Sequence, residues 1–364
     1  MSHSVNIIHG PMSNINSYGF VFPIWYYRNL LRASGIKIRF FDCLDDHLPS
    51  ADTIFLDSKV LKNNWLVGEE EGLRQIEFVR NRCDKLLWTN TSDGTGAIQR
   101  QVMPFVDYYL KSQIFSNQKD YQSSYYGDRA YTDFYHRTRG VVDHDELSTH
   151  GLTSTEIAKL RLSWNFGMAN YFSHSRAVIS QILKYTRFIP VRGYPDLATV
   201  AKRLSRANYL DRPVLFSARL SSNYSRNTVS YQRKQIKTRL TAMSIPLDRL
   251  SQRQYFRELA SSRFSFSPFG WGEVNIRDFE SIIAGAVLIK PDMSHIDTYP
   301  NVYQYNQSYI PIKWDLSDLE DVMASLRSSD CADIALEALD QYKKCIGKSG
   351  EADFVGRIYS LLGL

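Results

Sequence analysis

Strand-like apolar segments and helix-like segments alternate along most of the chain, and this alternation restricts the fold more than any other feature. Helical spacing of apolar residues appears in 20–35 and again in 69–83, where acidic residues occupy the first turn. Strand-like segments of the first half are VNIIHG (5–10), IKIRFFD (36–42), ADTIFLD (51–57), KLLWTNTSDGTG (85–96) and VDYYLKS (106–112). Strand, helix and strand in this order predict right-handed parallel crossovers, and hence a doubly wound α/β lobe.

A second alternation begins near residue 212. Its strand-like segments are 212–220, 263–269, 287–292 and 308–315, and its helix-like segments are 231–243, 251–262, 276–286 and 318–326. A chain of 364 residues exceeds the size of one hydrophobic core. We therefore expect two Rossmann-like lobes, 1–175 and 176–350, with a ligand site between them and a C-terminal helix in 351–364 that packs back on the first lobe.

Three further segments lie between the two alternations. Residues 117–150 are aromatic, charged and rich in turn-forming residues, which predicts an irregular insertion of the first lobe that is either functional or mobile. Apolar spacing then predicts a helix in 152–167, and a further helix around 174–187 should lead out of the lobe.

Composition excludes several classes of protein. The formal charge of +6 comes from Lys and Arg spread along the chain, whereas nucleic-acid binders gather them in a patch or arm. The N-terminal residues do not resemble a signal peptide, and the longest apolar run, 282–289, is far too short to span a membrane. Four widely spaced cysteines without a CxxC pair favour a reducing compartment and argue against structural zinc. We expect a cytoplasmic protein without a nucleic-acid partner.

The segment FSFSPFGWGEVNIRDFESIIAGAVLIKPD (264–292) contains the most informative pattern. Gly270 and Gly272 follow a strand and allow the backbone to approach an anion closely. A helix begins just after them, and its free N–H groups can bind that anion. In that helix Arg277 and Glu280 share one face. Arginine can clamp a diphosphate, and a carboxylate can accept hydrogen bonds from ribose hydroxyls. The alternative is an ordinary ion pair on an exposed helix.

This segment also resembles a known family. The pattern Ser-Pro-x-Gly-Trp-Gly (267–272), followed by Arg277, Glu280, Ile282 and Gly285, is similar to the C-terminal half of exostosin-type glycosyltransferases. The resemblance covers about residues 212–295, and Ala218 stands where the family usually has Gly. It implies the two-lobed GT-B architecture, with an acceptor lobe followed by a lobe that binds a UDP-sugar.

The resemblance also implies roles for individual residues. Arg277 would contact the diphosphate, and Glu280 would contact the ribose. Arg219, together with Arg233 or Lys234, would face the phosphates. In the wider group of two-lobed transferases a Glu-x7-Glu arrangement contacts the sugar. Its first position falls here on Gly272, with Glu273 one residue late. The remaining donor-site candidates are Trp271, Lys290 and Asp292, with His295 close by in the sequence. The alternative interpretation is that Asp292 caps a turn and that His295 lies at the surface.

Polar residues at strand ends supply candidates for a general base. Asp93 is the first choice, because a carboxylate at the end of the fourth strand can face the other lobe; the alternative is an Asp-Gly turn. The other histidine candidates are His9, His136 and His144, and the further polar residues at strand ends are Asn14, Asn16 and Ser17. A retaining mechanism would need no base. The sequence has no clear Asp-x-Asp motif, so we expect a metal-independent enzyme without a cofactor beyond its donor.

These patterns together predict a glycosyltransferase of bacterial type. It would move a sugar from a nucleotide-sugar to a glycan or lipid-linked acceptor in O-antigen or capsule synthesis. Its basic and aromatic surface could hold it peripherally at the inner membrane. A nucleotide-sugar epimerase of the same fold and a non-catalytic scaffold subunit are the alternatives, and only the transferase adds the sugar to an acceptor.

Overall fold

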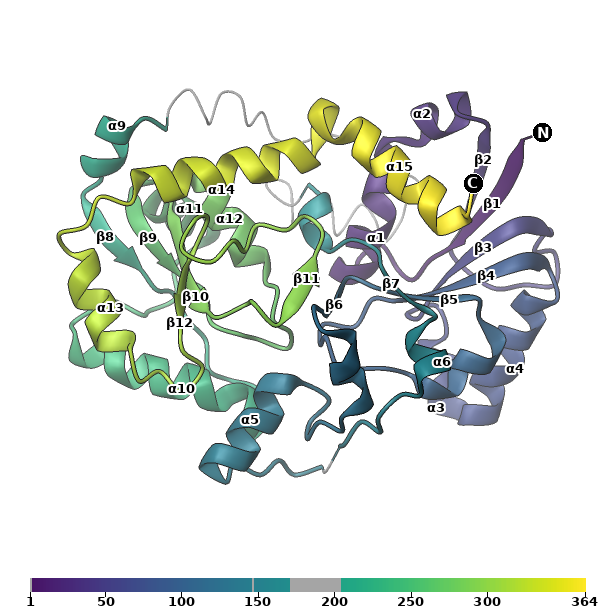
Figure 1. The fold of residues 1–364 in the computed structure, drawn as a ribbon, viewed down its shortest axis with the longest axis horizontal. Helices are drawn as coiled ribbons and strands as arrows, with labels where there is room; N and C mark the ends of the chain where they lie inside the picture. The colour runs from purple at the N-terminus through teal and green to yellow at the C-terminus, as the bar shows by residue number, and fades with distance from the viewer. Residues whose placement is uncertain (1, 146, 171–203) are drawn as a thin grey trace.

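The computed structural model describes residues 2–145, 147–170 and 204–364. Two α/β lobes lie side by side, the first built from the N-terminal half of the chain and the second from the C-terminal half (Figure 1). The helix predicted around 174–187 and the lobe boundary predicted at 175/176 fall outside the described residues.

The first lobe is built on a six-stranded sheet in which every neighbouring pair is parallel. The spatial order of its strands is β2 (Ile36–Phe41), β1 (His3–Ile8), β3 (Ala51–Asp57), β4 (Cys83–Asn90), β5 (Tyr108–Lys111) and β7 (Leu160–Leu162). The chain order reverses at β1, and polar loops follow β1 and β4 at the same edge of the sheet. Such a switch point is where ligands bind in open parallel sheets.

Helices of this lobe are α1 (Ile15–Tyr26), α2 (Arg28–Ala33), α3 (Lys62–Val67) and α4 (Glu69–Arg80), with a 3-10 turn η1 (Arg100–Phe105). The helix expected in 20–35 begins five residues earlier and is divided at Tyr27. Asn14 explains the earlier start, because its side chain accepts hydrogen bonds from the backbone N–H groups of Asn16 and Ser17.

The second lobe has a four-stranded parallel sheet. Its strands in spatial order are β12 (Ile310–Ile312), β10 (Val287–Pro291), β9 (Ser262–Phe266) and β8 (Val214–Ser217). Its helices are α9 (Arg206–Leu210), α10 (Asn227–Ala242), α11 (Gln252–Ala260), α12 (Ile276–Ala284), α13 (Leu319–Leu326) and α14 (Ala332–Cys345). Gly285 ends α12 with a φ of 71°, a left-handed conformation that glycine adopts without strain.

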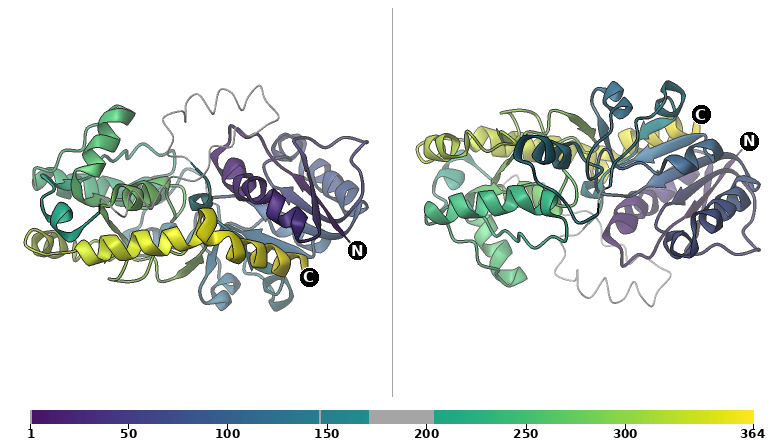
Figure 2. Two further views of the ribbon diagram at one scale, coloured as in Figure 1. Left: turned by 90° about the horizontal axis from the view of Figure 1, so that it is seen from above. Right: turned by 90° about the horizontal axis from the view of Figure 1, so that it is seen from below.

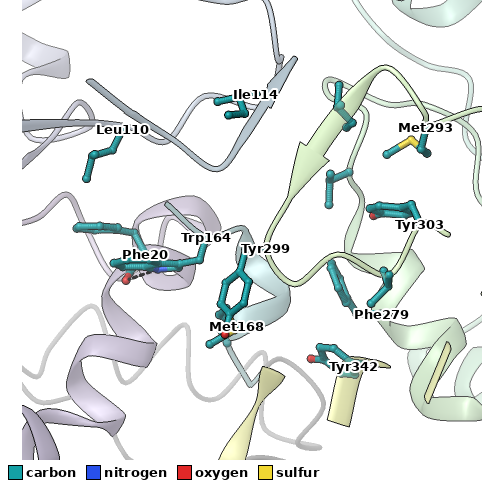
Figure 3. Close-up of a cluster of buried hydrophobic side chains, with 14 of the residues drawn as sticks. Phe20, Leu110, Ile114, Trp164, Met168, Phe279, Met293, Tyr299, Tyr303 and Tyr342 are labelled. Atoms are coloured by element: carbon teal, nitrogen blue, oxygen red, sulfur yellow. Dashed lines mark hydrogen bonds between the residues drawn. The ribbon is translucent and has the colours of Figure 1, made fainter. Parts of the chain in front are cut away.

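Strand pairing and a buried cluster connect the lobes. Strand β6 (Gln113–Phe115) of the first lobe pairs antiparallel with β11 (Ile296–Thr298) of the second. Figure 3 shows the buried cluster that runs from Phe20 and Trp164 through Tyr299 to Phe279 and Tyr342. The two lobes therefore share buried apolar contacts in addition to main-chain hydrogen bonds.

The C-terminal helix crosses between the lobes. From α14 the chain passes through η4 (Gly347–Gly350) into α15 (Glu351–Leu362), which lies on the first lobe (Figures 1 and 2). Phe354 packs against Tyr27 with ring centroids 5.0 Å apart, and Lys85 Nζ donates to the carbonyl of Leu362.

Two expectations about the middle of the chain are wrong. Residues 117–150 are not wholly irregular, because they contain η2 (Gln118–Gln122) and the helix α5 (Ala130–Arg139), which packs on α10 of the second lobe. The single helix expected in 152–167 is instead α6 (Ser154–Ile157), the edge strand β7 and η3 (Phe166–Met168). Pairing of β7 with β5 overrides the local helical spacing, because ladder hydrogen bonds and burial at the sheet edge outweigh propensity.

Candidate active site

A pocket of about 590 Å³ lies between the lobes. In the first lobe its wall comes mainly from the start of α1 and the loop after β4. In the second lobe it comes mainly from the loops after β8 and β9 and from helices α10, α11 and α12. The predicted residues that line it are Asn16, Asp93, Arg219, Arg233, Trp271, Gly272, Arg277 and Glu280. The predicted GT-B-like fold, two Rossmann-like lobes with a ligand pocket between them, is confirmed by these strand orders and by the position of the pocket.

Arg233, on α10, is held in the wall by main-chain carbonyls. Its guanidinium donates to Phe269 O at 2.5 Å, Ser221 O at 3.1 Å and Pro268 O at 3.2 Å. Burial lowers its pKa, but an arginine stays protonated at neutral pH. Within the described ranges Arg233 forms no ion pair, so its positive charge is not neutralised by a carboxylate there.

Arg277, on α12, is held in the same manner. Its guanidinium donates to Arg219 O at 2.5 Å and to Phe266 O at 3.3 Å. In the part of the chain that the structure describes, it too forms no ion pair. One turn later on the same face, Glu280 accepts a hydrogen bond from Tyr255 Oη at 3.1 Å. The predicted shared face of Arg277 and Glu280 is therefore turned into the pocket.

Arg219 also lines the pocket, but its charge is compensated. It makes several hydrogen bonds to Glu258, with Nε 3.0 Å and 3.1 Å from the two carboxylate oxygens, and these bonds raise the pKa of the guanidinium. Ser217 Oγ adds a 2.8 Å bond to the same carboxylate. A phosphate near Arg219 would compete with Glu258 for these donors.

The Gly-Trp-Gly turn is held by the first lobe. Tyr131 Oη donates to Gly270 O at 2.6 Å, and a Cβ added at Gly272 would lie 2.0 Å from Asp93 O. We expected the glycines to allow close backbone approach to an anion; at Gly272 the close approach is to the backbone of the opposite lobe. Trp271 is 39% exposed, and its ring lies 5.5 Å from that of Tyr224 in the pocket wall.

Glu273 lies outside the pocket, in the contact between the lobes. It is fully buried, and its Oε2 accepts from Gln113 Nε2 at 2.7 Å and from Thr95 N at 3.2 Å. Burial raises the pKa of this carboxyl. Its position suits interlobe contact better than contact with a donor sugar.

The candidate base Asp93 lies on the first-lobe side of the pocket. Asn16 Nδ2 donates to its Oδ1 at 2.8 Å and so restricts the orientation of the carboxylate. The three histidine candidates lie elsewhere: His9 contacts Gly10 O, His136 stacks on Tyr126, and His144 is exposed on the surface.

Three other donor-site candidates are outside the pocket lining. Lys290 is fully buried and pairs with Asp278 at 3.1 Å, and burial lowers its pKa. Asp292 accepts hydrogen bonds from Ser294, and Lys234 is exposed on α10. His295, expected at the surface in the alternative interpretation, is instead enclosed by aromatic rings, and burial lowers its pKa to about 4.

Several residues that line the pocket were not predicted from the sequence: Phe166, Ser221, Tyr224, Arg249 and Tyr255. Ser221 and Tyr224 lie in the polar loop after β8, and that position next to a strand end was the one available signal. Tyr255 is on α11, where its helical spacing resembles that of an ordinary amphipathic helix, so nothing in the sequence marked it.

Within the described ranges no group of three or more His, Cys, Asp and Glu side chains is arranged to hold a metal ion. No described helix combines the length and apolar character required to cross a membrane.

Comparison with known proteins gives structural matches only. No protein-family model and no curated protein matches the chain, so the exostosin resemblance has no support from a family model. Anabaena HepE in complex with UDP and glucose aligns over 100% of both chains with a TM-score of 0.47 and 10% identity. An alpha-glucosyltransferase bound to UDP-glucose and DNA aligns over 100% of both chains (TM-score 0.43, 8% identity). A glycosyltransferase from Rickettsia africae aligns over 99% of this chain and 98% of its own (0.44, 9%). At these low scores the fold assignment rests on the strand order described above, and function has to be argued from the pocket.

Proposed function

We propose that the protein is a glycosyltransferase that binds a nucleotide-sugar in the pocket between its lobes. One observation carries the proposal: Arg233 and Arg277 present two guanidinium groups to the pocket, and Glu280 lies one turn from Arg277 on the same helix face. Both cations are held by main-chain carbonyls and keep a net positive charge. Such a pair suits a diphosphate, and a carboxylate at this spacing suits ribose hydroxyls.

The proposed reaction transfers the sugar at its anomeric carbon. The bond from that carbon to the diphosphate oxygen breaks, and a bond to an acceptor oxygen forms. Negative charge develops on the departing diphosphate, where Arg233 and Arg277 would stabilise it without help from a metal ion. In an inverting reaction Asp93 would take the proton of the acceptor hydroxyl, as a general base held in orientation by Asn16.

The proposed donor is a UDP-sugar, and the proposed acceptor is a glycan or a lipid-linked oligosaccharide of a bacterial surface polysaccharide such as O-antigen or capsule. The enzyme would act in the cytoplasm, in solution or at the inner face of the membrane. Nucleic acid is not among the proposed partners, because Lys and Arg are dispersed along the sequence.

Calorimetric titration with UDP, GDP, CMP and dTDP, with and without Mg²⁺, tests the donor site. We expect one nucleotide to bind in either buffer and binding to weaken at least about tenfold in Arg277→Ala, since one charge-assisted hydrogen-bonding group is lost. Arg253→Ala, on the exposed side of α11, is the matched control and should bind as the wild type does. Absence of binding to a folded protein would reject the transferase. Conversion of the sugar without an acceptor would identify an epimerase instead.

A further inference from the structure

A small second cavity opens beside the main pocket, on the side of the first lobe. Its volume is about 20 Å³, and it shares Asn16, Asp93 and Phe166 with the main pocket. The rest of its wall comes from Phe20 on α1, from the end of β4 and the loop after it, from the residues just after β7, and from the link between β5 and β6. A cavity of this size accommodates one water-sized group.

Three polar side-chain atoms of the wall have no hydrogen-bond partner among the described residues. They are Thr89 Oγ1, Ser92 Oγ and Asn16 Oδ1. Thr89 is only 1% exposed, so its hydroxyl is removed from bulk water. Leaving a buried hydroxyl unpaired costs free energy, and a group that enters the cavity can recover that cost by bonding to it.

Neighbouring polar groups in the same wall are already satisfied. Thr91 Oγ1 donates to Asp57 at 2.9 Å, and Ser163 Oγ donates to Lys111 O at 2.9 Å. The three unpaired atoms therefore remain available to a group that enters the cavity, and one of them belongs to Asn16, whose amide donates to Asp93 at 2.8 Å.

The charge of the lining limits what can enter. It contains one carboxylate, Asp93, and no Lys or Arg. Lys111 precedes the lining residue Ser112 in the sequence, but it is not itself part of the lining. Its side chain donates to Gly94 O and Ala97 O. A phosphate placed here would be repelled by the carboxylate of Asp93, and the lining holds no cation to compensate. A neutral hydroxyl carries no charge and would not be repelled.

We propose that this cavity receives a single neutral hydroxyl of a saccharide acceptor. The hydroxyl donates to Asp93 and accepts from Thr89 and Ser92, and on transfer its proton passes to Asp93 as its oxygen bonds to the anomeric carbon. The acceptor atom is then a sugar hydroxyl and not the phosphate of a lipid carrier. This inference rests on the proposed function and names the acceptor chemistry of the same site.

Saturation-transfer NMR on the full chain, with UDP at saturation, tests this acceptor inference. The probes are the methyl glycosides of glucose, galactose and mannose, and farnesyl phosphate. We expect at least one glycoside to bind the wild type and its Kd to rise about tenfold in Thr89→Val, which keeps the side-chain shape and removes one hydrogen bond. Ser92→Ala should act in the same direction. Thr53→Val, a buried threonine of β3 outside the cavity, is the matched control and should leave the Kd unchanged.

The outcomes separate the two proposals. UDP binding should be retained in Thr89→Val, which also shows that the variant is folded. The acceptor inference is overturned if the wild type binds UDP but no glycoside. It is also overturned if Thr89→Val and Ser92→Ala leave the Kd for the glycoside unchanged. In both cases the proposed donor site is unaffected. Binding of farnesyl phosphate that is lost in Thr89→Val would overturn it as well. Failure of UDP alone to bind would instead reject the proposed UDP-sugar donor, and failure of UDP, GDP, CMP and dTDP alike would reject the proposed function.

Discussion

The arginines of the pocket differ in role because each has different hydrogen-bond partners. Arg219 is neutralised by Glu258, whereas Arg233 and Arg277 are held by carbonyl oxygens that position the guanidinium without cancelling its charge. The sequence marks each of them as basic, but only their neighbours decide which can bind an anion.

Glycine 272 gives a test at the residue scale. In Gly272→Ala the new Cβ would meet the backbone oxygen of Asp93 at 2.0 Å, and a backbone atom cannot move aside as a flexible side chain can. We expect the free energy of unfolding, measured by urea denaturation, to fall by about 1–3 kcal/mol. Gly356→Ala is the control: it lies in the exposed interior of α15, and beyond its chain neighbours and the helix's own backbone no atom lies within 4 Å of an added Cβ. This substitution should raise stability by up to about 1 kcal/mol. Equal stability of wild type and Gly272→Ala would refute the close interlobe contact.

Helix α12 determines the geometry of the donor site at the scale of a single element. Asp278 anchors its first turn, because it accepts from Asn275 N and Tyr303 Oη and pairs with Lys290 of β10. This buried anchor fixes the rotation of the helix about its axis. Arg277 and Glu280 are thereby turned toward the pocket.

Removing one partner of that anchor should be costly. Lys290→Met leaves the carboxylate of Asp278 buried without its cation, and we expect a loss of about 3 kcal/mol in urea unfolding. The double variant Lys290→Met/Asp278→Asn should recover part of this loss. Lys344→Met, which breaks the exposed pair with Asp340 on α14, should cost no more than about 0.5 kcal/mol. Similar losses in the two single variants would contradict a buried anchor.

At the scale of the whole molecule, the lobes are joined by more than their connecting chain. The β6–β11 pair, helix α15 and the contacts of Glu273 each cross from one lobe to the other. Helix α5 of the first half also packs on α10 of the second. These contacts define the spacing across which Asp93 faces the guanidinium groups.

The buried carboxyl of Glu273 makes this junction sensitive to pH. Because burial raises its pKa above 4.5 on folding, the folded state holds the proton more tightly than the unfolded state. Below pH 4.5 this carboxyl therefore does not lower the free energy of unfolding. As the pH rises from 4.5 through the pKa of the folded state, it lowers the free energy of unfolding by an increasing amount.

Urea unfolding between pH 4.5 and 6.5 tests this contribution. Wild type should lose stability relative to Glu273→Gln as the pH rises, since glutamine keeps an acceptor for Thr95 N and carries no charge. Glu337→Gln, at an exposed site on α14, should show no such trend relative to wild type. Parallel curves for wild type and Glu273→Gln would show that the junction does not perturb this carboxyl.

The α/β class, the two lobes and the strand-loop-helix segment that contains Arg277 and Glu280 could be predicted from the sequence, because these features depend on local periodicity and on spacing within one helix. The other features depend on contacts between residues far apart in the chain. Helical spacing in 152–167 gave way to pairing of β7 with β5, and the glycine expected to approach an anion instead approaches Asp93. Lys290 and Glu273 were expected in the donor site and are buried elsewhere. Which charge remains available to a ligand depends on partners far away in the chain, such as Glu258 for Arg219, and no local pattern reports those partners.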